Sequence, residues 1–207
     1  MIAIIDYGLG NPLSIKNMLK KIGEPSVITS DFEVLGNAGK LILPGVGNFE
    51  KGMQNIEQTG LRDFLNTQVL EKKKPILGIC LGMQLMTSFS EEGHVQGLGF
   101  VNARTEKFIF DQSNVKVPHM AWTDTDFENV FVQNNEFEED LPRFYYVHSY
   151  FVKCENRNEV LCTANYGNRS FDSGFIKDNI MGVQFHPEKS HVFGKKFLEK
   201  FVKWNPK

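Results

Sequence analysis

The chain has 207 residues, enough for one domain of ordinary size with its own hydrophobic core. Its 23 basic and 25 acidic residues give a formal charge of −2, which argues against a nucleic-acid or membrane-surface partner. No apolar run approaches the roughly 20 residues that a membrane span needs, and the apolar N-terminus lacks the basic segment of a secretion signal.

The first half of the chain alternates short β-branched runs with amphipathic stretches, a pattern typical of βαβ units around a parallel sheet. Its first helix has the clearest boundaries, with Asn11 as the cap, Pro12 in the first turn and Gly23 as the stop. The pattern predicts strands at 1–5, 27–29, 40–43 and 75–79, and helices at 12–22, at 60–70 and from about residue 81.

After Gly97 the pattern changes to longer strands that we expect to pair antiparallel. They are predicted in VNARTEKFIF, RFYYVHSYFVKC and VLCTANYG, and the acidic, Asn-rich stretch 124–140 is predicted to be a loop. A strand at 180–185 and an amphipathic helix from about Phe193 close the chain. Because no linker or repeat divides the sequence, we expect residues 1–207 to form one α/β domain.

The cysteines number three and are widely spaced, at Cys80, Cys154 and Cys162. They form neither a disulfide framework nor a CxxC metal pattern. We therefore expect free thiols and a cytoplasmic protein.

One of these cysteines lies in GICLGMQ (78–84), where a predicted strand turns into a predicted helix. Cys80 is flanked by Gly78 and Gly82, which is the layout of a nucleophile elbow, a strained turn that exposes its central side chain. The start of a helix also favours the thiolate, the form that attacks. The alternative for this motif alone is an unreactive cysteine buried between two packing glycines.

A base for this cysteine is offered by GVQFHPEKS. In an extended backbone, side chains two residues apart share a face, so Glu188 can hold His186 while the other ring nitrogen points toward a nucleophile. The alternative for this motif alone is a surface salt bridge. Cys80, His186 and Glu188 together would supply a nucleophile, a base and the group that orients the base.

Attack on an amide or ester carbon would put negative charge on oxygen, which backbone N–H groups can stabilise. The elbow predicts one such donor at Leu81. We expect the second from the loop in LILPGVGNF, at Val46 or Gly47. An ordinary Pro-Gly turn is the alternative for this loop.

The stretches PGVGNF, GICLGMQL and QFHPEKS, in this order and at this separation, resemble the class I, triad-type glutamine amidotransferases over essentially the whole chain. Within that family, DYGLGN, PHMAW and YYVHSY are most similar to the HisH type, the glutaminase subunits of imidazole glycerol phosphate synthase. The resemblance implies a flavodoxin-like, three-layer α/β fold with a mainly parallel central sheet and an added antiparallel portion.

The resemblance also implies a reaction, the hydrolysis of L-glutamine to L-glutamate and ammonia through a glutamyl thioester on Cys80. His186 would be the base and Glu188 its orienting group, and neither a metal nor an organic cofactor is implied. For His148, a strand histidine satisfied by its neighbours is the alternative. The implied substrate-binding residues are Gly47, Gln84, His148, Ser149 and Tyr150.

A partner is implied as well, a HisF-type (β/α)₈-barrel subunit that receives the ammonia through a channel and forms a heterodimer in histidine biosynthesis. Met and Trp are typical interface anchors, although core packing is the alternative for PHMAW. The expected partner-facing residues are Asn11, Pro118, Met120 and Trp122.

Two stretches depart from the usual histidine-pathway pattern. GNPLS lacks the usual arginine, and PHMAWT has Ala121 and Thr123 where the pattern has Gly and Asn. These departures leave open a HisH-like paralogue that supplies ammonia for amidine or amino sugars of surface polysaccharides. From another class, a binding or regulatory module that has lost turnover is a further alternative.

Overall fold

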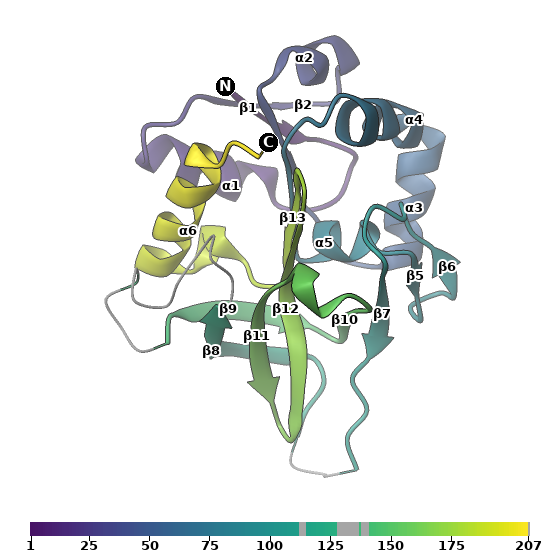
Figure 1. Ribbon diagram of the computed structural model, residues 1–207, viewed down its shortest axis with the longest axis vertical. Helices are drawn as coiled ribbons and strands as arrows, with labels where there is room; N and C mark the ends of the chain where they lie inside the picture. The colour runs from purple at the N-terminus through teal and green to yellow at the C-terminus, as the bar shows by residue number, and fades with distance from the viewer. Residues whose placement is uncertain (112–114, 128–136, 138–140, 207) are drawn as a thin grey trace.

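The structure is a computed structural model that describes residues 1–111, 115–127, 137 and 141–206 (Figure 1). Its strands are β1 (Ile2–Ile5), β2 (Ser26–Thr29), β3 (Lys40–Leu43), β4 (Ile76–Ile79), β5 (Phe89–Ser90), β6 (Val95–Gln96), β7 (Ala103–Lys107), β8 (His119–Phe127), β9 (Arg143–His148), β10 (Tyr150–Cys154), β11 (Val160–Tyr166), β12 (Arg169–Lys177) and β13 (Ile180–Val183). Its helices are α1 (Pro12–Lys21), α2 (Phe32–Asn37), α3 (Phe49–Gln58), α4 (Leu61–Leu65), α5 (Leu81–Leu85) and α6 (His191–Lys203). A π-helical turn spans Asn66–Glu71, and 3-10 turns span Arg157–Glu159 and Pro187–Lys189.

These strands form one mixed sheet in the order β2-β1-β3-β4-β13-β12-β10-β7-β5-β6. The pairs from β2 to β13 are parallel, whereas β12 pairs antiparallel with both β13 and β10, and β10 pairs antiparallel with β7. A second antiparallel branch leaves β12 through β11, β8 and β9. The expected parallel sheet with an antiparallel addition is therefore confirmed.

Two hydrophobic cores lie on opposite faces of the parallel strands. Along β1, Ile2 and Ile4 belong to the core that contains α1 and α6, and Ala3 and Ile5 belong to the core that contains α3 and α4. Figure 1 shows the same three layers, with α1 and α6 on one side of the sheet and α3, α4 and α5 on the other. Because both faces are covered, the parallel strands are apolar almost without interruption.

The helix expected at the start of the chain forms as predicted. The Asn11 side-chain oxygen accepts the Ser14 N–H at 3.3 Å, Pro12 is the first helical residue, and Gly23 adopts a φ of 79° after the last turn. These caps satisfy backbone groups that a helix leaves unpaired at its ends.

Several element predictions were wrong. Helices α2 and α3 were not predicted, and the helix predicted at 60–70 is the short α4 followed by the π-helical turn. The stretch RFYYVHSYFVKC is not one strand: it breaks at Ser149, because β9 pairs with β8 whereas β10 pairs with β7 and β12.

The predicted loop at 124–140 is also wrong in its first part. Residues 124–127 belong to β8, where they pair with β9 and β11. Of the remainder, only Phe137 lies within the described residues, and its side chain is buried against Phe127 and Phe144.

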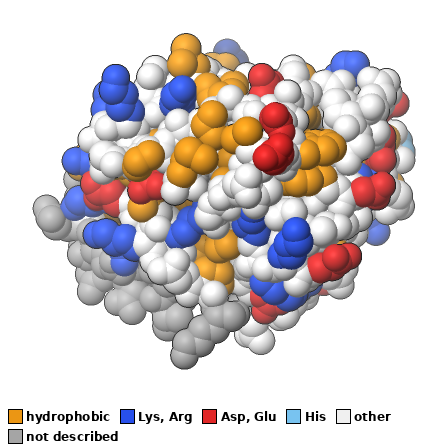
Figure 2. Space-filling view, turned by 90° about the horizontal axis from the view of Figure 1, so that it is seen from above, with side chains coloured by type: hydrophobic (Ala, Val, Ile, Leu, Met, Phe, Trp, Pro, Cys, Tyr) orange, Lys and Arg blue, Asp and Glu red, His pale blue; other side chains and the backbone are white. Residues whose placement is uncertain are grey.

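The end of the molecule that carries the amino ends of the parallel strands is partly apolar. Figure 2 looks onto this end and shows hydrophobic side chains gathered among charged ones. Met1 and Leu70, which precede β1 and β4, are exposed. In the part of the chain that the structure describes, no helix is long and apolar enough to cross a membrane.

Three glycines allow β3, β4 and α5 to approach one another closely. A Cβ on Gly78 would lie 2.7 Å from the Met83 nitrogen, and one on Gly45 would lie 2.6 Å from the Gly82 nitrogen. A Cβ on Gly82 would overlap the Leu43 carbonyl oxygen. Each of these contacts is with backbone, so no side-chain rotation relieves it.

We predict that Gly82→Ala lowers the free energy of unfolding by about 3 kcal/mol or more, because the added methyl group cannot fit beside the Leu43 carbonyl. Urea titration followed by circular dichroism measures this change. The matched control is Gly36→Ala in α2, where a Cβ would meet nothing within 4 Å. It should be neutral or stabilising by up to about 1 kcal/mol, and equal destabilisation by both variants would contradict the packing argument.

Candidate active site

The backbone turns sharply at Cys80, between the end of β4 and the start of α5. Cys80 has a φ of 54° and a ψ of −110°, in a region that non-glycine residues rarely adopt. Strain of this kind costs about 1–3 kcal/mol and persists only where the surroundings hold the backbone. Here the Cys80 N–H donates to the Val183 carbonyl at 2.8 Å, which ties the turn to β13.

The neighbouring strand brings His186 to the same place. β13 pairs with β4 in parallel, with Val183 opposite Ile79, so the residues that follow the two strands leave the sheet side by side. The His186 ring is buried, and its Nδ1 lies 2.8 Å from the Glu188 Oε1. Its Nε2 is buried without a hydrogen-bond partner among the described residues.

The pairing of His186 with Glu188 was expected, but the backbone that produces it was not. Glu188 lies in the 3-10 turn Pro187–Lys189 rather than in an extended segment. The turn is fixed by Ser190, whose hydroxyl donates to the His186 carbonyl at 2.6 Å and accepts the Tyr145 N–H at 3.0 Å. Because both side chains are buried, the surface salt bridge that the motif alone allowed is excluded.

The charges around His186 favour its protonated form. Burial lowers the pKa of His186, but an ionised Cys80 and the Glu188 carboxylate outweigh burial and raise the pKa to about 10. The Cys80 sulfur raises the pKa of His186 through its charge, since no hydrogen bond joins it to Nε2 in the structure. The arrangement therefore suits a proton that moves from sulfur to nitrogen.

A cavity of about 270 Å³ opens beside Cys80, between the loop after β3, the start of α5 and the junction of β9 with β10. It gathers every residue predicted for oxyanion and substrate binding, together with Glu92 and Val147, which the sequence analysis missed. The lining residues are Val46, Gly47, Cys80, Leu81, Gln84, Glu92, Pro118, Val147, His148, Ser149 and Tyr150.

The predicted oxyanion donors lie together but are not free. The Leu81 N–H donates to the Gly45 carbonyl at 3.3 Å. The peptide bond between Gly45 and Val46 is trans, so the Val46 N–H points opposite to that carbonyl. The Tyr7 hydroxyl fixes the preceding carbonyl, that of Pro44, at 2.8 Å. In this state the Leu81 and Val46 N–H groups therefore do not form a two-donor oxyanion hole.

Both ring nitrogens of His148 form hydrogen bonds with neighbouring residues, which was the alternative prediction for this histidine. Its Nδ1 lies 2.8 Å from the Tyr150 carbonyl, which can only accept, so Nδ1 carries the proton and Nε2 accepts. Nε2 in turn lies 3.0 Å from His119 Nδ1, and His119 Nε2 lies 2.8 Å from the Thr123 hydroxyl. Direct binding of substrate by the His148 ring is therefore not supported, although the residue lines the cavity.

Both of these histidines are neutral near pH 7. Burial lowers the pKa of His119 to about 4, and burial together with His119 lowers the pKa of His148 to about 3. Gln84 is likewise engaged, since its Nε2 donates to the Tyr150 carbonyl and to Gln184 Oε1, each at 2.9 Å. Only the Oε1 of Gln84 is left for a ligand.

The residues predicted to face a partner are exposed. Met120 and Trp122 alternate with inward-facing residues along β8 and are 61% and 41% exposed, which rules out core packing for both. Pro118 is exposed at the cavity, and Asn11 is exposed while it caps α1. The Trp122 ring stacks on His191 at the start of α6.

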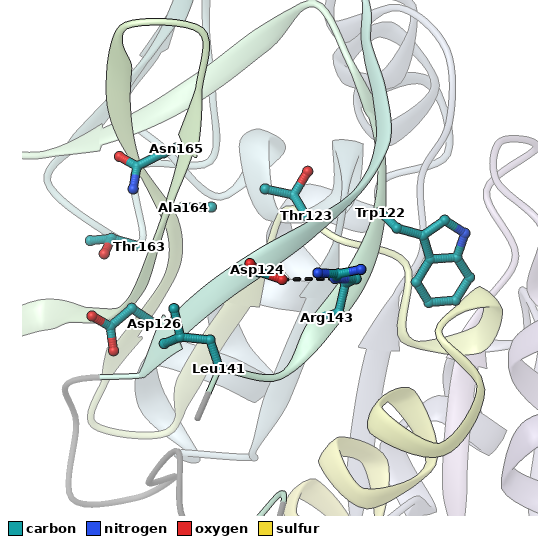
Figure 3. Close-up of a pocket in the computed structure, with 9 residues that line it drawn as sticks. All are labelled: Trp122, Thr123, Asp124, Asp126, Leu141, Arg143, Thr163, Ala164 and Asn165. Atoms are coloured by element: carbon teal, nitrogen blue, oxygen red, sulfur yellow. Dashed lines mark hydrogen bonds and ion pairs between the residues drawn. The ribbon is translucent and has the colours of Figure 1, made fainter. Parts of the chain in front are cut away.

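A larger cavity, of about 470 Å³, lies away from Cys80 on β8, β9 and β11 (Figure 3). Asp124 and Arg143 form an ion pair across β8 and β9 at 2.8 Å, and the Trp122 ring points away from them toward α6. Neither Cys80 nor His186 reaches this cavity. Although this cavity is larger than the one beside Cys80, we therefore do not assign it as the active site.

Comparison with known proteins relates the whole chain to one family. The family model for "Glutamine amidotransferase class-I" matches residues 3–204. The chain is 53% identical over 206 residues to "Imidazole glycerol phosphate synthase subunit HisH 2" of Methanococcus maripaludis, covering 98% of this chain and 99% of the relative. It is 42% identical over 207 residues to "Imidazole glycerol phosphate synthase subunit HisH" of Leptospira interrogans, covering 98% and 99%.

Solved structures show the same fold at low sequence identity. One described as "Crystal structure of glutamine amidotransferase" matches with a TM-score of 0.72 at 18% identity, over 98% of each chain. The glutaminase domain of Trypanosoma brucei CTPS, with bound acivicin, matches with a TM-score of 0.63 at 14% identity, over 99% of this chain and 94% of that one.

We predict that Glu188→Gln lowers the pKa of His186 by about one unit or more, because the carboxylate that raises it is lost. The folded-state pKa of about 10 lies above the ordinary value of 6.5. The stability that this shift contributes is therefore fully present below about pH 6.5 and is lost as the pH rises toward 10. The measurements are an NMR titration of the His186 ring and urea unfolding of both proteins from pH 6 to pH 10.

The matched control for this prediction is Glu199→Gln, which removes an exposed carboxylate paired with Lys195 on α6. Its stability relative to the wild type should not change across the same pH range. A stability difference between wild type and Glu188→Gln that grew with rising pH would contradict the assignment of charges.

Proposed function

The chain belongs to the class-I glutamine amidotransferase family, and on this premise we propose that it is the glutaminase subunit of an imidazole glycerol phosphate synthase. It would hydrolyse L-glutamine to L-glutamate and ammonia and deliver the ammonia to a HisF-type (β/α)₈-barrel subunit for histidine biosynthesis. The names of the relatives favour this pathway over a surface-polysaccharide paralogue. The proposal takes residues 1–207 as one cytoplasmic glutaminase domain, with its thiols free.

One observation carries the proposed chemistry: Cys80 is held in a strained turn at a cavity, beside a buried histidine that is paired with a carboxylate. In the proposed reaction, Cys80 Sγ gives its proton to His186 Nε2 and attacks the side-chain amide carbon of glutamine. His186 then protonates the nitrogen that leaves as ammonia, and Glu188 keeps the ring oriented through Nδ1. Water then gives a proton to His186 and attacks the thioester carbon. The C–S bond breaks, the Cys80 sulfur takes the proton back from His186, and glutamate is released.

The oxyanion hole requires a change at the loop after β3. Rotation of the peptide between Gly45 and Val46 would release the Leu81 N–H and turn the Val46 N–H toward the cavity. Two donors would then stabilise the negative oxygen, with Gly47 as a further candidate. Val46 is 38% exposed at the cavity, so a partner that contacts it could favour the rotated state. On this proposal the isolated chain hydrolyses glutamine slowly, because it lacks the two donors.

Glutamine itself would lie in the cavity between Gly47, Gln84 and the backbone of residues 148–150. Glu92 supplies a carboxylate there: its Oε2 accepts the Phe49 N–H at 2.8 Å, which fixes the side chain. We assign it to the α-ammonium group of the substrate, because a carboxylate fixed in this way pairs well with a cation.

The barrel subunit would dock over the mouth of the cavity. Pro118 and Val46 are exposed at the cavity, and Met120 and Trp122 are exposed on the adjoining strand β8. Exposed Met and Trp side chains fit the composition of interface centres. Asn11 belongs to the same proposed interface, and docking there would close a channel for ammonia between the two subunits.

We predict that Cys80→Ser abolishes glutamate release, lowering it by at least about a thousandfold, because the nucleophile is lost. The purified chain is assayed with L-glutamine alone and with its HisF-type barrel and the barrel's nucleotide ligand. Cys154→Ala is the matched control, because Cys154 is buried on β10 and away from the cavity. It should keep the wild-type rate, and undiminished release by Cys80→Ser would refute the assignment.

The same assay separates the pathways. Stimulation by barrel and histidine-pathway ligand together supports the proposed function. Failure of that ligand, with Cys80 still reactive toward a glutamine-like electrophile, would indicate the polysaccharide paralogue. Inertness toward glutamine and the electrophile would indicate a binding module that has lost turnover.

We predict that Glu92→Gln raises the KM for glutamine about 10- to 100-fold, with a smaller change in kcat, because a charged hydrogen bond to the substrate is lost. Steady-state kinetics of the complex with the barrel measure both constants. Glu91→Gln, which alters the adjacent exposed carboxylate, is the control. An unchanged KM in Glu92→Gln would contradict the assignment.

A further inference from the structure

Gln184 is a fully buried polar residue that directly follows β13, two residues before His186. Its backbone N–H donates to the Ser173 carbonyl at 2.8 Å, which holds the residue against β12. A buried amide side chain is costly unless its oxygen and nitrogen both find partners. The partners of this side chain therefore show what it is placed to do.

The orientation of the amide follows from its neighbours. The Tyr150 carbonyl can only accept, so the nitrogen of Gln84 must face it, at 2.9 Å. That same nitrogen lies 2.9 Å from the Gln184 side chain, which must present its oxygen there. The Gln184 nitrogen then points the other way, where it lies 3.6 Å from Cys80 Sγ. The network thus assigns which atom of the Gln184 amide faces the sulfur.

A hydrogen-bond donor in this position stabilises the thiolate form of Cys80 more than the thiol form. A thiol is a weak hydrogen-bond acceptor, whereas a thiolate is an anion, and an N–H directed at it favours the anionic form. The site is buried, so the donor acts in a medium of low dielectric, where such contacts are stronger than in water. Gln84 fixes the donor in advance, because it holds the Gln184 oxygen.

We propose that Gln184 is a further catalytic residue, which donates a hydrogen bond to the Cys80 sulfur and stabilises its reactive anion. Gln84 is the positioning residue that orients Gln184. The catalytic role rests on the proposed function of Cys80, but the contact itself does not depend on glutamine or on a partner subunit.

Alkylation by iodoacetamide tests the contact directly, because the thiolate displaces iodide and the thiol reacts slowly. The rate at Cys80 is measured against pH in the full chain by peptide mass spectrometry, for wild type and Gln184→Met. In Gln184→Met the midpoint should move to higher pH, and the rate below the midpoint should fall about tenfold. Cys154 and Cys162 give little background, since burial raises the pKa of both thiols.

Two further variants sharpen the test. Gln68→Met is the matched control, because Gln68 is also buried but lies in the π-helical turn and away from the cavity. It should leave the alkylation profile unchanged. Gln84→Met should slow alkylation by a smaller factor than Gln184→Met, and the double variant should be no slower than Gln184→Met alone, because Gln84 acts through Gln184.

A measurement on the unaltered residue covers the case in which Gln184→Met fails to fold. The side-chain amide signals of Gln184 in a ¹⁵N NMR titration should shift as Cys80 ionises, and should not shift in Cys80→Ala. Two results would overturn the proposal. One is superimposable alkylation profiles for wild type and a folded Gln184→Met, and the other is a Gln184 amide signal that does not shift when Cys80 ionises. Neither readout uses glutamine hydrolysis, so failure here is distinct from failure of the proposed function.

Discussion

The close approach of β3, β4 and α5 at three glycines is the constraint on which the site depends. Gly45, Gly78 and Gly82 let backbone meet backbone where any side chain would collide. This contact holds Cys80 at a positive φ, a conformation that the chain would not adopt alone. It also sets the loop after β3 directly against the first N–H of α5. The same packing therefore places the buried Cys80 side chain at the edge of the cavity and controls the proposed oxyanion donors.

The pairing of β4 with β13 supplies the second requirement, a base at the right distance. These strands are far apart in sequence, but their parallel register brings the residues after them side by side. The three histidines in this region differ in their preferred protonation state. His186 gains a carboxylate and an ionisable sulfur and favours protonation, whereas His119 and His148 are buried against each other and stay neutral. Because His119 and His148 stay neutral, only His186 is suited to exchange a proton with Cys80.

Local sequence signals predicted much of this frame. Asn11 and Pro12 marked the start of α1, the glycine spacing marked the turn at Cys80, and the pattern predicted β3 at its observed bounds. Such features depend on neighbours in the chain. Helix α3 had a usable signal that was overlooked, since Phe49, Met53 and Ile56 recur at helical spacing after the cap residue Asn48.

Other features had no local signal, because they arise from pairing across the fold. The break at Ser149 depends on which strands flank β9 and β10, and a continuous β pattern hides it. Glu92 becomes a pocket residue only when β5 and its turn lie beside α3. The bond between Leu81 and Gly45 is a backbone contact that no side-chain pattern encodes. The sequence around Gln184 held one clue, a polar residue that directly follows an apolar strand.

The most direct test of the central claim is to trap the covalent intermediate. The chain, mixed with its barrel subunit and the barrel's ligand, is incubated with L-glutamine, quenched in acid and analysed by peptide mass spectrometry. We predict a glutamyl group on the peptide that contains Cys80, and none on the peptides that contain Cys154 and Cys162. Continued release of glutamate with no glutamyl group on Cys80 would contradict the account.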